Sequence, residues 1–334
     1  MSRAAVAFPG RGAYGPGSLG SLPASHEWVQ RADALRGEQE LPPLSELDAA
    51  DRFTPAVHLR PSNAWPLTFL ASLLDAERIA DDHEVVVVVA ASTGWYTALA
   101  AAGALGFDDA FRLVQAMALA AEEPLPEGEQ PAELVYALTS DSWDRDEGRS
   151  SAIDRVLAET DDGAYRALEL GSHAVIAGTA GAIERVATSL PAVTVGGRSF
   201  PLRLASADAW HTPLRSEAAG SAAASVGDLA WDRPNVTLVD GRGRRWTPWA
   251  TDARALASET MTGLADAPYD FARAFRVALR EYAPDAVLLP GPGTTLGAAC
   301  AQLIVADGYR GIRTRAEFEA TQAGANPILL SVRR

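Results

Sequence analysis

The chain has 334 residues, of which 48% are hydrophobic and 22% charged, so it can bury a large core and has the composition of a globular protein. Its formal net charge is −14, and every one of its 29 basic residues is an arginine. This acidic balance excludes sequence-independent nucleic-acid binding, which needs a basic surface. No apolar run has the length of a membrane span, so we expect a cytoplasmic protein without a membrane partner.

The single cysteine, Cys300, lies in an Ala-rich apolar run. One cysteine cannot form an internal disulfide, a Cys-rich zinc site or a redox pair. We therefore expect Cys300 to be buried in a helix, and we predict no metal site.

The first 125 residues alternate between strand and helix patterns. Five consecutive valines make residues 84–90 the clearest predicted strand. The predicted elements, in chain order, are a strand at 4–8, a helix at 64–80, the strand at 84–90, a helix from about residue 95 and a helix at 108–122. A helix, a strand, a sharp turn and another helix in succession predict a parallel sheet of the α/β class.

A linker rich in Pro, Glu and Gly follows at 123–130, and a different pattern begins after it. Its predicted elements are strands at 134–139, 165–168, 174–177 and 199–204, with helices at 151–160 and 181–190. This βαββαβ order is that of ferredoxin-like domains. Further strands at 236–239 and 286–289 and helices at 253–263 and 270–282 then resume the first pattern. We predict a small ferredoxin-like subdomain at 126–206, inserted into a large subdomain made of 1–125 and 207–334.

The turn after the valine strand has the layout of a nucleophile elbow. Ser92 would stand at the apex, with Ala90 and Gly94 supplying the small side chains that a tight strand-to-helix turn requires. At a helix N-terminus, free N–H groups and the helix dipole also favour an oxyanion beside the serine. The alternative is a serine that only caps the helix, and this short motif alone leaves the two interpretations equally open.

A serine hydroxyl needs a neighbouring base to become a nucleophile. Of the five histidines, His211 follows a predicted strand at the place where the chain returns from the small subdomain to the large one. His26, His58 and His83 are expected on helix or loop surfaces, and His173 lies inside the small subdomain. A base at the junction would lie in an interdomain cleft, so His211 is the candidate.

Three separated segments resemble, in the same order, motifs of the malonyl-CoA:acyl-carrier-protein transacylase family and of polyketide synthase acyltransferase domains. Phe8-Pro9-Gly10-Arg11-Gly12 is similar to Phe-Pro-Gly-Gln-Gly, Ala90-Ala91-Ser92-Thr93-Gly94 to Gly-His-Ser-x-Gly, and Trp210-His211-Thr212-Pro213-Leu214 to Phe-His-Ser-Pro-Leu. Weaker matches at 175–178, 235–237 and 291–293 extend the resemblance over nearly the whole chain.

The resemblance implies an α/β-hydrolase-like large subdomain and an acyltransferase that carries its acyl group on Ser92. His211 would be the general base, and the backbone N–H groups of Arg11 and Thr93 would form the oxyanion hole. It also implies that a carbonyl near residues 268–271 orients the histidine, which makes Asp270 a candidate orienting group.

Departures from the family pattern predict a changed acyl pocket. The arginine that binds the malonyl carboxylate in the family aligns with Met117, so we expect an acyl group without a free carboxylate. Arg60 replaces a glutamine before the first large helix, Ala91 replaces the elbow histidine, and Trp95 replaces a glutamate. We assign Met117, Arg60, Trp95 and Trp210 to substrate binding.

Among transferases without that arginine, the chain resembles stand-alone enzymes of macrolactam pathways, which move aminoacyl or dipeptidyl groups between two carrier proteins. Donor and acceptor would then both be acyl carrier proteins, with the acyl group delivered on phosphopantetheine and no bound cofactor. Candidate contacts for an acidic carrier protein are five arginines in two exposed-looking stretches: Arg242, Arg244, Arg245, Arg310 and Arg313. Each of these is also consistent with an ordinary solvated loop charge.

Several other functions fit parts of the pattern. A thioester hydrolase that edits carrier proteins, or a malonyl-CoA:ACP transacylase, would use the same serine and histidine. Gly10-x-Gly12-x-x-Gly15 matches a dinucleotide fingerprint, but Pro9 and Pro16 flank it where a strand and helix should continue. A non-catalytic docking module is suggested by Ala91 and Trp95, and the retention of Ser92 and His211 disfavours it.

Overall fold

The computed structural model describes residues 1–80, 82–160 and 163–332. A six-stranded sheet forms the centre of the large subdomain, in the order β10-β9-β2-β1-β12-β13. Its strands are β1 (Ser2–Phe8), β2 (His83–Ala90), β9 (Thr237–Val239), β10 (Arg245–Trp246), β12 (Ala286–Leu289) and β13 (Leu329–Ser331). All neighbours pair in parallel except β9 and β10, so the predicted parallel α/β sheet is confirmed.

The central strands are buried because helices cover both faces of the sheet. Residues 4–8 of β1 are all buried, and the valines of β2 become fully buried toward the end of the strand that leads to Ser92. The helices of the large subdomain are α1 (Glu27–Gly37), α2 (Leu44–Asp48), α3 (Pro55–His58), α4 (Pro61–Ala80), α5 (Gly94–Ala101), α6 (Phe107–Ala120), α9 (Ser216–Ser225), α10 (Ala253–Ser258), α11 (Phe271–Tyr282), α12 (Thr295–Ala306) and α13 (Arg315–Gln322). Of these, α4, α5, α11 and α12 pack directly on its strands.

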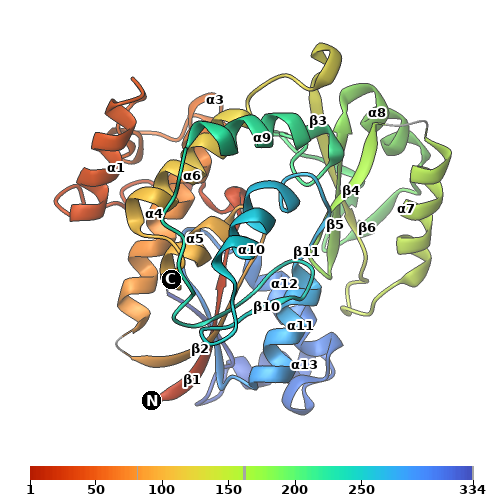
Figure 1. The fold of residues 1–334 in the computed structure, drawn as a ribbon. Coiled ribbons are helices and arrows are strands. Elements are labelled where there is room, and N and C mark those ends of the chain that lie inside the picture. Colours follow the sequence, from red (N-terminus) through yellow and green to blue (C-terminus); the bar gives the residue numbers. More distant parts are fainter. Residues whose placement is uncertain (81, 161–162, 333–334) are drawn as a thin grey trace.

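The second subdomain has the predicted βαββαβ order. Its elements are β3 (Pro131–Ala137), α7 (Glu147–Glu159), β4 (Ala164–Glu169), β5 (His173–Thr179), α8 (Ala180–Ser189) and β8 (Leu202–Arg203), with an added hairpin of β6 (Val193–Val195) and β7 (Arg198–Phe200). The strand order β4-β5-β3-β8, antiparallel throughout, is that of a ferredoxin-like sheet. In Figure 1 this subdomain, with α7 and α8 on its outer side, lies beside the large one.

One short strand crosses between the predicted subdomains. β11 (Tyr269–Asp270) lies outside the range 126–206, yet it pairs in parallel with β4 and adds a fifth strand to the small sheet. A segment of the large subdomain is therefore paired by backbone hydrogen bonds with the small sheet, in addition to the connections of the chain. The functional residues described below lie around this junction.

Two residues allow direct checks of the sequence predictions. Cys300 is fully buried in α12, as predicted. His58 was expected at the surface, and this was wrong: its ring is buried, with Nε2 3.0 Å from the carbonyl oxygen of Leu47 and Nδ1 3.0 Å from the backbone of Thr54. No helix within the described residues is long and apolar enough to cross a membrane.

Candidate active site

The turn between β2 and α5 places Ser92 in a strained backbone conformation. Ser92 has a φ of 54°, a left-handed value that is uncommon for residues other than glycine. The turn also brings α5 against the end of β1, since a Cβ atom on Gly94 would lie 2.5 Å from the carbonyl oxygen of Pro9. The sequence requirement for a small residue two positions after the serine therefore has a clear steric cause.

The structure brings Ser92 and His211 together, although 119 residues separate them in the chain. The hydroxyl of Ser92 lies 2.7 Å from Nε2 of His211, and Nδ1 of the same ring lies 2.6 Å from the carbonyl oxygen of Leu264. A carbonyl oxygen can only accept a hydrogen bond, so Nδ1 carries the ring proton. Nε2 is therefore the acceptor of the serine hydroxyl proton, which is the arrangement of a general base.

The orienting carbonyl belongs to Leu264, so the prediction that Asp270 orients the histidine was wrong. The carboxylate of Asp270 instead caps α11 by accepting the N–H of Arg273 at 2.8 Å. The backbone of His211 is held in the same region, because its N–H donates to the carbonyl oxygen of Ala265 at 2.8 Å. A carbonyl group cannot be recognised from the sequence, since every residue offers one.

Burial controls the protonation of the base. His211 is buried, and this lowers the pKa of its imidazole to about 4, although its contact with Leu264 and the charge of Asp208 act in the opposite direction. The ring is therefore neutral near pH 7, with a free Nε2 lone pair. A neutral imidazole next to a serine hydroxyl can accept the proton of that hydroxyl.

The two predicted oxyanion-hole residues lie next to each other. The N–H of Arg11 donates to the Oγ1 atom of Thr93 at 2.9 Å, so in this structure the Arg11 donor is engaged by a side chain. Thr93 is the N-cap residue of α5, and the N–H groups of Gly94 and Trp95 at the start of this helix donate to the carbonyl oxygens of Ala91 and Ser92. An oxyanion that accepts the Arg11 N–H would therefore have to take the place of the Thr93 hydroxyl on that donor.

A cavity of about 430 Å³ opens beside Ser92 and His211. It lies between the elbow and one face of the small sheet, because β3, β4 and β5 all contribute to its wall. The wall is largely apolar, with Leu59, Val135, Leu168, Leu170, Val175 and Leu204 among its residues. A cavity of this size and character is typical of a site for a small molecule or an acyl chain.

Only one of the four predicted substrate-binding residues lies on this wall. Trp210 does, packing edge to face on Trp65 with ring centroids 5.1 Å apart. Met117 is fully buried in the core of the large subdomain, Trp95 is buried with its indole N–H on Thr260, and Arg60 is an exposed partner of Glu122. The assignment of these three residues to the pocket is not supported by the structure.

A buried ionic cluster on the cavity wall was not predicted from the sequence. The guanidinium of Arg11 pairs with the carboxylates of Glu133 at 2.6 Å and Asp208 at 3.0 Å. We call these three residues the carboxylate-arginine cluster. The sequence contained one signal, because Glu133 places an acidic residue within an apolar strand pattern, where a carboxylate needs a buried partner.

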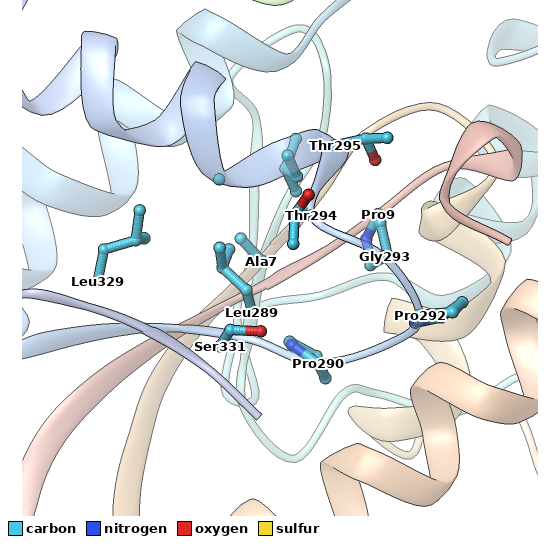
Figure 2. Close-up of a pocket in the computed structure, with 12 residues that line it drawn as sticks. Ala7, Pro9, Leu289, Pro290, Pro292, Gly293, Thr294, Thr295, Leu329 and Ser331 are labelled. Carbon is cyan, nitrogen blue, oxygen red and sulfur yellow. The ribbon is translucent and has the colours of Figure 1, made fainter. Parts of the chain in front are cut away.

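A second, smaller cavity of about 160 Å³ lies at the N-terminal end of α12, and Figure 2 shows it. Prolines and small residues of the loop after β12 form much of its wall, with Pro9 from the loop after β1. Thr295 and Leu296 belong to the walls of both cavities. The smaller cavity has no ionisable side chain among its described lining residues, so the chemistry lies in the larger one.

The five arginines proposed as carrier-protein contacts do not lie on the wall of the larger cavity, as far as the chain is described. Arg242, Arg245 and Arg310 pair with Glu259, Glu281 and Asp285, Arg244 lies 3.8 Å above the ring centroid of Trp246, and Arg313 donates its backbone N–H to Glu317. Their role as contacts stays a prediction.

Comparison with known proteins identifies related sequences. No protein-family model matches the chain. It is 25% identical over 247 residues to the malonyl CoA-acyl carrier protein transacylase of Escherichia coli K12, an alignment that covers 72% of this chain and 74% of that protein. The transacylase of Salmonella typhimurium LT2 matches similarly, at 25% identity over 244 residues.

Solved structures share the fold. An acyl-carrier-protein S-malonyltransferase from Burkholderia pseudomallei matches with a TM-score of 0.74 at 21% identity, covering 99% of this chain and 96% of that one. A malonyl-transacylase solved with a type II polyketide synthase acyl-carrier protein matches with a TM-score of 0.73 at 20% identity, covering 91% and 93%. The chain is thus similar in sequence to malonyl CoA-acyl carrier protein transacylases and has the fold of these acyltransferases.

Proposed function

We propose that this protein is an acyltransferase that moves an acyl group between acyl carrier proteins through an ester on Ser92. The observation that carries the proposal is the chain of contacts from Ser92 through His211 to the carbonyl oxygen of Leu264, on the wall of a largely apolar cavity. The names of the similar proteins and the shared fold support the same reaction class.

Each half of the reaction uses the same two side chains. In the first half, the Ser92 oxygen attacks the thioester carbonyl while its proton passes to Nε2 of His211. The carbon–sulfur bond then breaks, the leaving sulfur takes the proton from His211, and an ester remains on Ser92. In the second half, an acceptor thiol gives its proton to His211 and attacks the ester, and Ser92 leaves with that proton.

We further propose that the acyl group lacks a free carboxylate. Arg11 is the only arginine among the described residues of the cavity wall, and two carboxylates already neutralise its charge. The carboxylate-arginine cluster has a net charge of −1 when both acids are ionised, so a malonyl carboxylate would meet repulsion and no free cation. Met117 is buried away from the cavity wall and does not select the acyl group.

The finer proposal is that the group is aminoacyl or dipeptidyl and that the enzyme acts in polyketide or macrolactam biosynthesis. The carboxylates of Glu133 and Asp208 on the cavity wall favour an acyl chain with a protonated amine over one with a carboxylate. The main rival is a malonyl-CoA:ACP transacylase, which is what the similar proteins are named.

A second rival is a thioester hydrolase, in which water replaces the acceptor thiol. Incubation with an acylated donor carrier protein and a second, unacylated carrier protein separates the two reactions. Acyl groups accumulating on the second carrier are expected, and free acid should be a minor product. Release of mostly free acid, at an unchanged rate when the second carrier is left out, would instead establish hydrolysis.

A further inference from the structure

Glu133 is an acidic residue in the interior of the molecule. It lies on β3, the first strand of the small subdomain, and only 4% of its surface is exposed. A buried carboxylate is costly unless charges and hydrogen bonds compensate for its lost hydration. The contacts of its two oxygens therefore show what the residue holds in place.

One oxygen of Glu133 holds the loop after β1. Oε2 lies 2.6 Å from Nη2 of Arg11, the residue whose backbone N–H is the predicted oxyanion donor. Arg11 also pairs with Asp208 and lies within hydrogen-bond reach of the Ser206 carbonyl oxygen. The side chain of Arg11 thus fixes its own loop against the small subdomain, where Glu133 provides the shortest contact.

The other oxygen of Glu133 holds the segment that leads to the base. Oε1 accepts the backbone N–H groups of Asp208 and Ala209, both at 3.0 Å. Two residues of this segment, Ala209 and His211, have left-handed φ values of 54° and 64°. Such conformations persist only where the surroundings hold them, and these two hydrogen bonds hold the backbone at Asp208 and at the strained residue Ala209 itself.

We propose that Glu133 is a positioning residue, which fixes the Arg11 loop and the segment 208–211 relative to each other through its two carboxylate oxygens. The inference rests on the proposed function, because it assigns the oxyanion donor to one segment and the base to the other. Removing the carboxylate moves these two groups apart, and small displacements of reacting groups lower rates strongly.

The test follows ester formation on Ser92 by quenched-flow intact-protein mass spectrometry, with butyryl-N-acetylcysteamine thioester as an uncharged probe. Glu133→Ala removes both sets of contacts and is expected to lower the acylation rate constant about 100-fold. Glu133→Gln keeps an oxygen for the two backbone donors but loses the ionic pair, so on the order of 10-fold is expected. In both variants kcat falls while KM for the probe changes little.

A double-mutant cycle tests the contact with Arg11. Arg11→Met is slow by itself, because it leaves Glu133 buried without its cation. If the two residues act as one unit, the double variant Arg11→Met/Glu133→Gln is no slower than the slower single variant. If the fold loss of acylation rate in the double variant equals the product of the two single losses, Glu133 acts independently of Arg11.

Glu169→Gln provides the matched control. Glu169 is a partly buried glutamate of the same small sheet that pairs with Arg145 and Arg166, outside the larger cavity wall. It should acylate at the wild-type rate even if its unfolding midpoint falls as much as that of Glu133→Gln. Equal rates in the control and in both folded Glu133 variants would overturn the inference. An unacylated wild type would instead overturn the proposed function.

Discussion

The protonation state of one histidine sets the chemistry that this cavity can perform. Because the Leu264 carbonyl fixes the proton on Nδ1, His211 presents its lone pair to Ser92. Its pKa, lowered to about 4 by burial, keeps the ring neutral through the ordinary pH range. The base is thus available without a carboxylate on its second nitrogen, which distinguishes this arrangement from a Ser-His-Asp triad.

The raised pKa of a second buried group, Glu133, gives a test by pH. Burial raises the pKa of the Glu133 carboxyl to about 7, and the nearby charge of Asp208 acts in the same direction, whereas the charge of Arg11 acts against it. The guanidinium of Arg215 also faces this carboxyl. Protonation of Glu133 below pH 7 removes its negative charge and weakens its ion pair with Arg11. The Ser92 acylation rate of the wild type should therefore fall in this pH range. In Glu133→Gln the rate is lower but stays flat down to about pH 4, where His211 gains a proton.

Stability should respond with the opposite sign. A raised folded-state pKa means that Glu133 binds its proton more tightly in the folded chain, so this contribution to stability is present below the ordinary pKa and is lost as pH rises toward 7. Denaturant titrations from pH 4.5 to 8 should show a smaller decline in Glu133→Gln than in the wild type. If the Ser92 acylation rate falls below pH 7 in the same way in the wild type and in Glu133→Gln, protonation of Glu133 is not the cause of that fall.

A substitution at Met117 tests whether this residue lies in the acyl pocket, as the family resemblance implies, or in the core, as the structure shows. Restoring the family's arginine with Met117→Arg would place a guanidinium in a fully buried core position. An unpaired buried charge of this kind should lower the free energy of unfolding by about 3 to 5 kcal/mol, without conferring malonyl transfer. Urea titration and mass spectrometry with malonyl carrier protein measure both effects, and Met117→Leu is the control. A stable Met117→Arg protein that becomes malonylated would restore Met117 to the pocket.

Residues with a distinctive chemistry were predictable from the sequence, whereas the contacts that depend on three-dimensional placement were not. Ser92 and His211 stood out because each lies in a segment that resembles a motif of one enzyme family, and the structure brings them together. Leu264 contributes only a carbonyl group, which leaves no trace in the sequence. Met117 was placed in the pocket by alignment alone, and the packing of its helix decides otherwise.

At the scale of elements, the elbow depends on the close approach of β1 and α5. An added methyl group in Gly94→Ala would lie 2.5 Å from the Pro9 carbonyl oxygen and 2.8 Å from that of Phe8, both of them backbone atoms. The expected cost is about 1 to 3 kcal/mol of unfolding free energy, together with loss of ester formation as the elbow shifts.

Gly220→Ala is the matched control, because Gly220 also lies in a helix but has open space around the added Cβ. It should be neutral or stabilising by up to about 1 kcal/mol, since alanine favours helix. Urea unfolding of the two variants gives the comparison. A Gly94→Ala protein as stable and active as Gly220→Ala would show that the tight turn is not required.

Long periodic elements were predicted well, and short ones were not. The valine strand and the helix over 108–122 appear as β2 and α6 within a few residues of their predicted bounds. β11, with two residues, has no periodicity to detect, and its pairing with β4 arises from the packing of distant segments. Helix α9 was also missed, since its small residues lack a strong apolar stripe.

At the scale of the molecule, the cavity lies where loops of the large subdomain meet the sheet of the small one. The large subdomain provides Ser92 and the Arg11 loop, the small sheet provides the apolar wall and Glu133, and the returning chain provides His211. The inserted subdomain could be predicted from its element order. The charge of the cavity could not, because it depends on residues 11, 133 and 208 meeting in space.

The most direct test is intact-protein mass spectrometry of the wild type and Ser92→Ala after incubation with malonyl and aminoacyl carrier proteins in parallel. We expect an ester on the wild type from the aminoacyl carrier, none on Ser92→Ala, and little malonylation. Efficient malonylation of Ser92 would contradict the assignment of a non-carboxylate acyl group. An acyl group that persists in Ser92→Ala would show that another residue carries it.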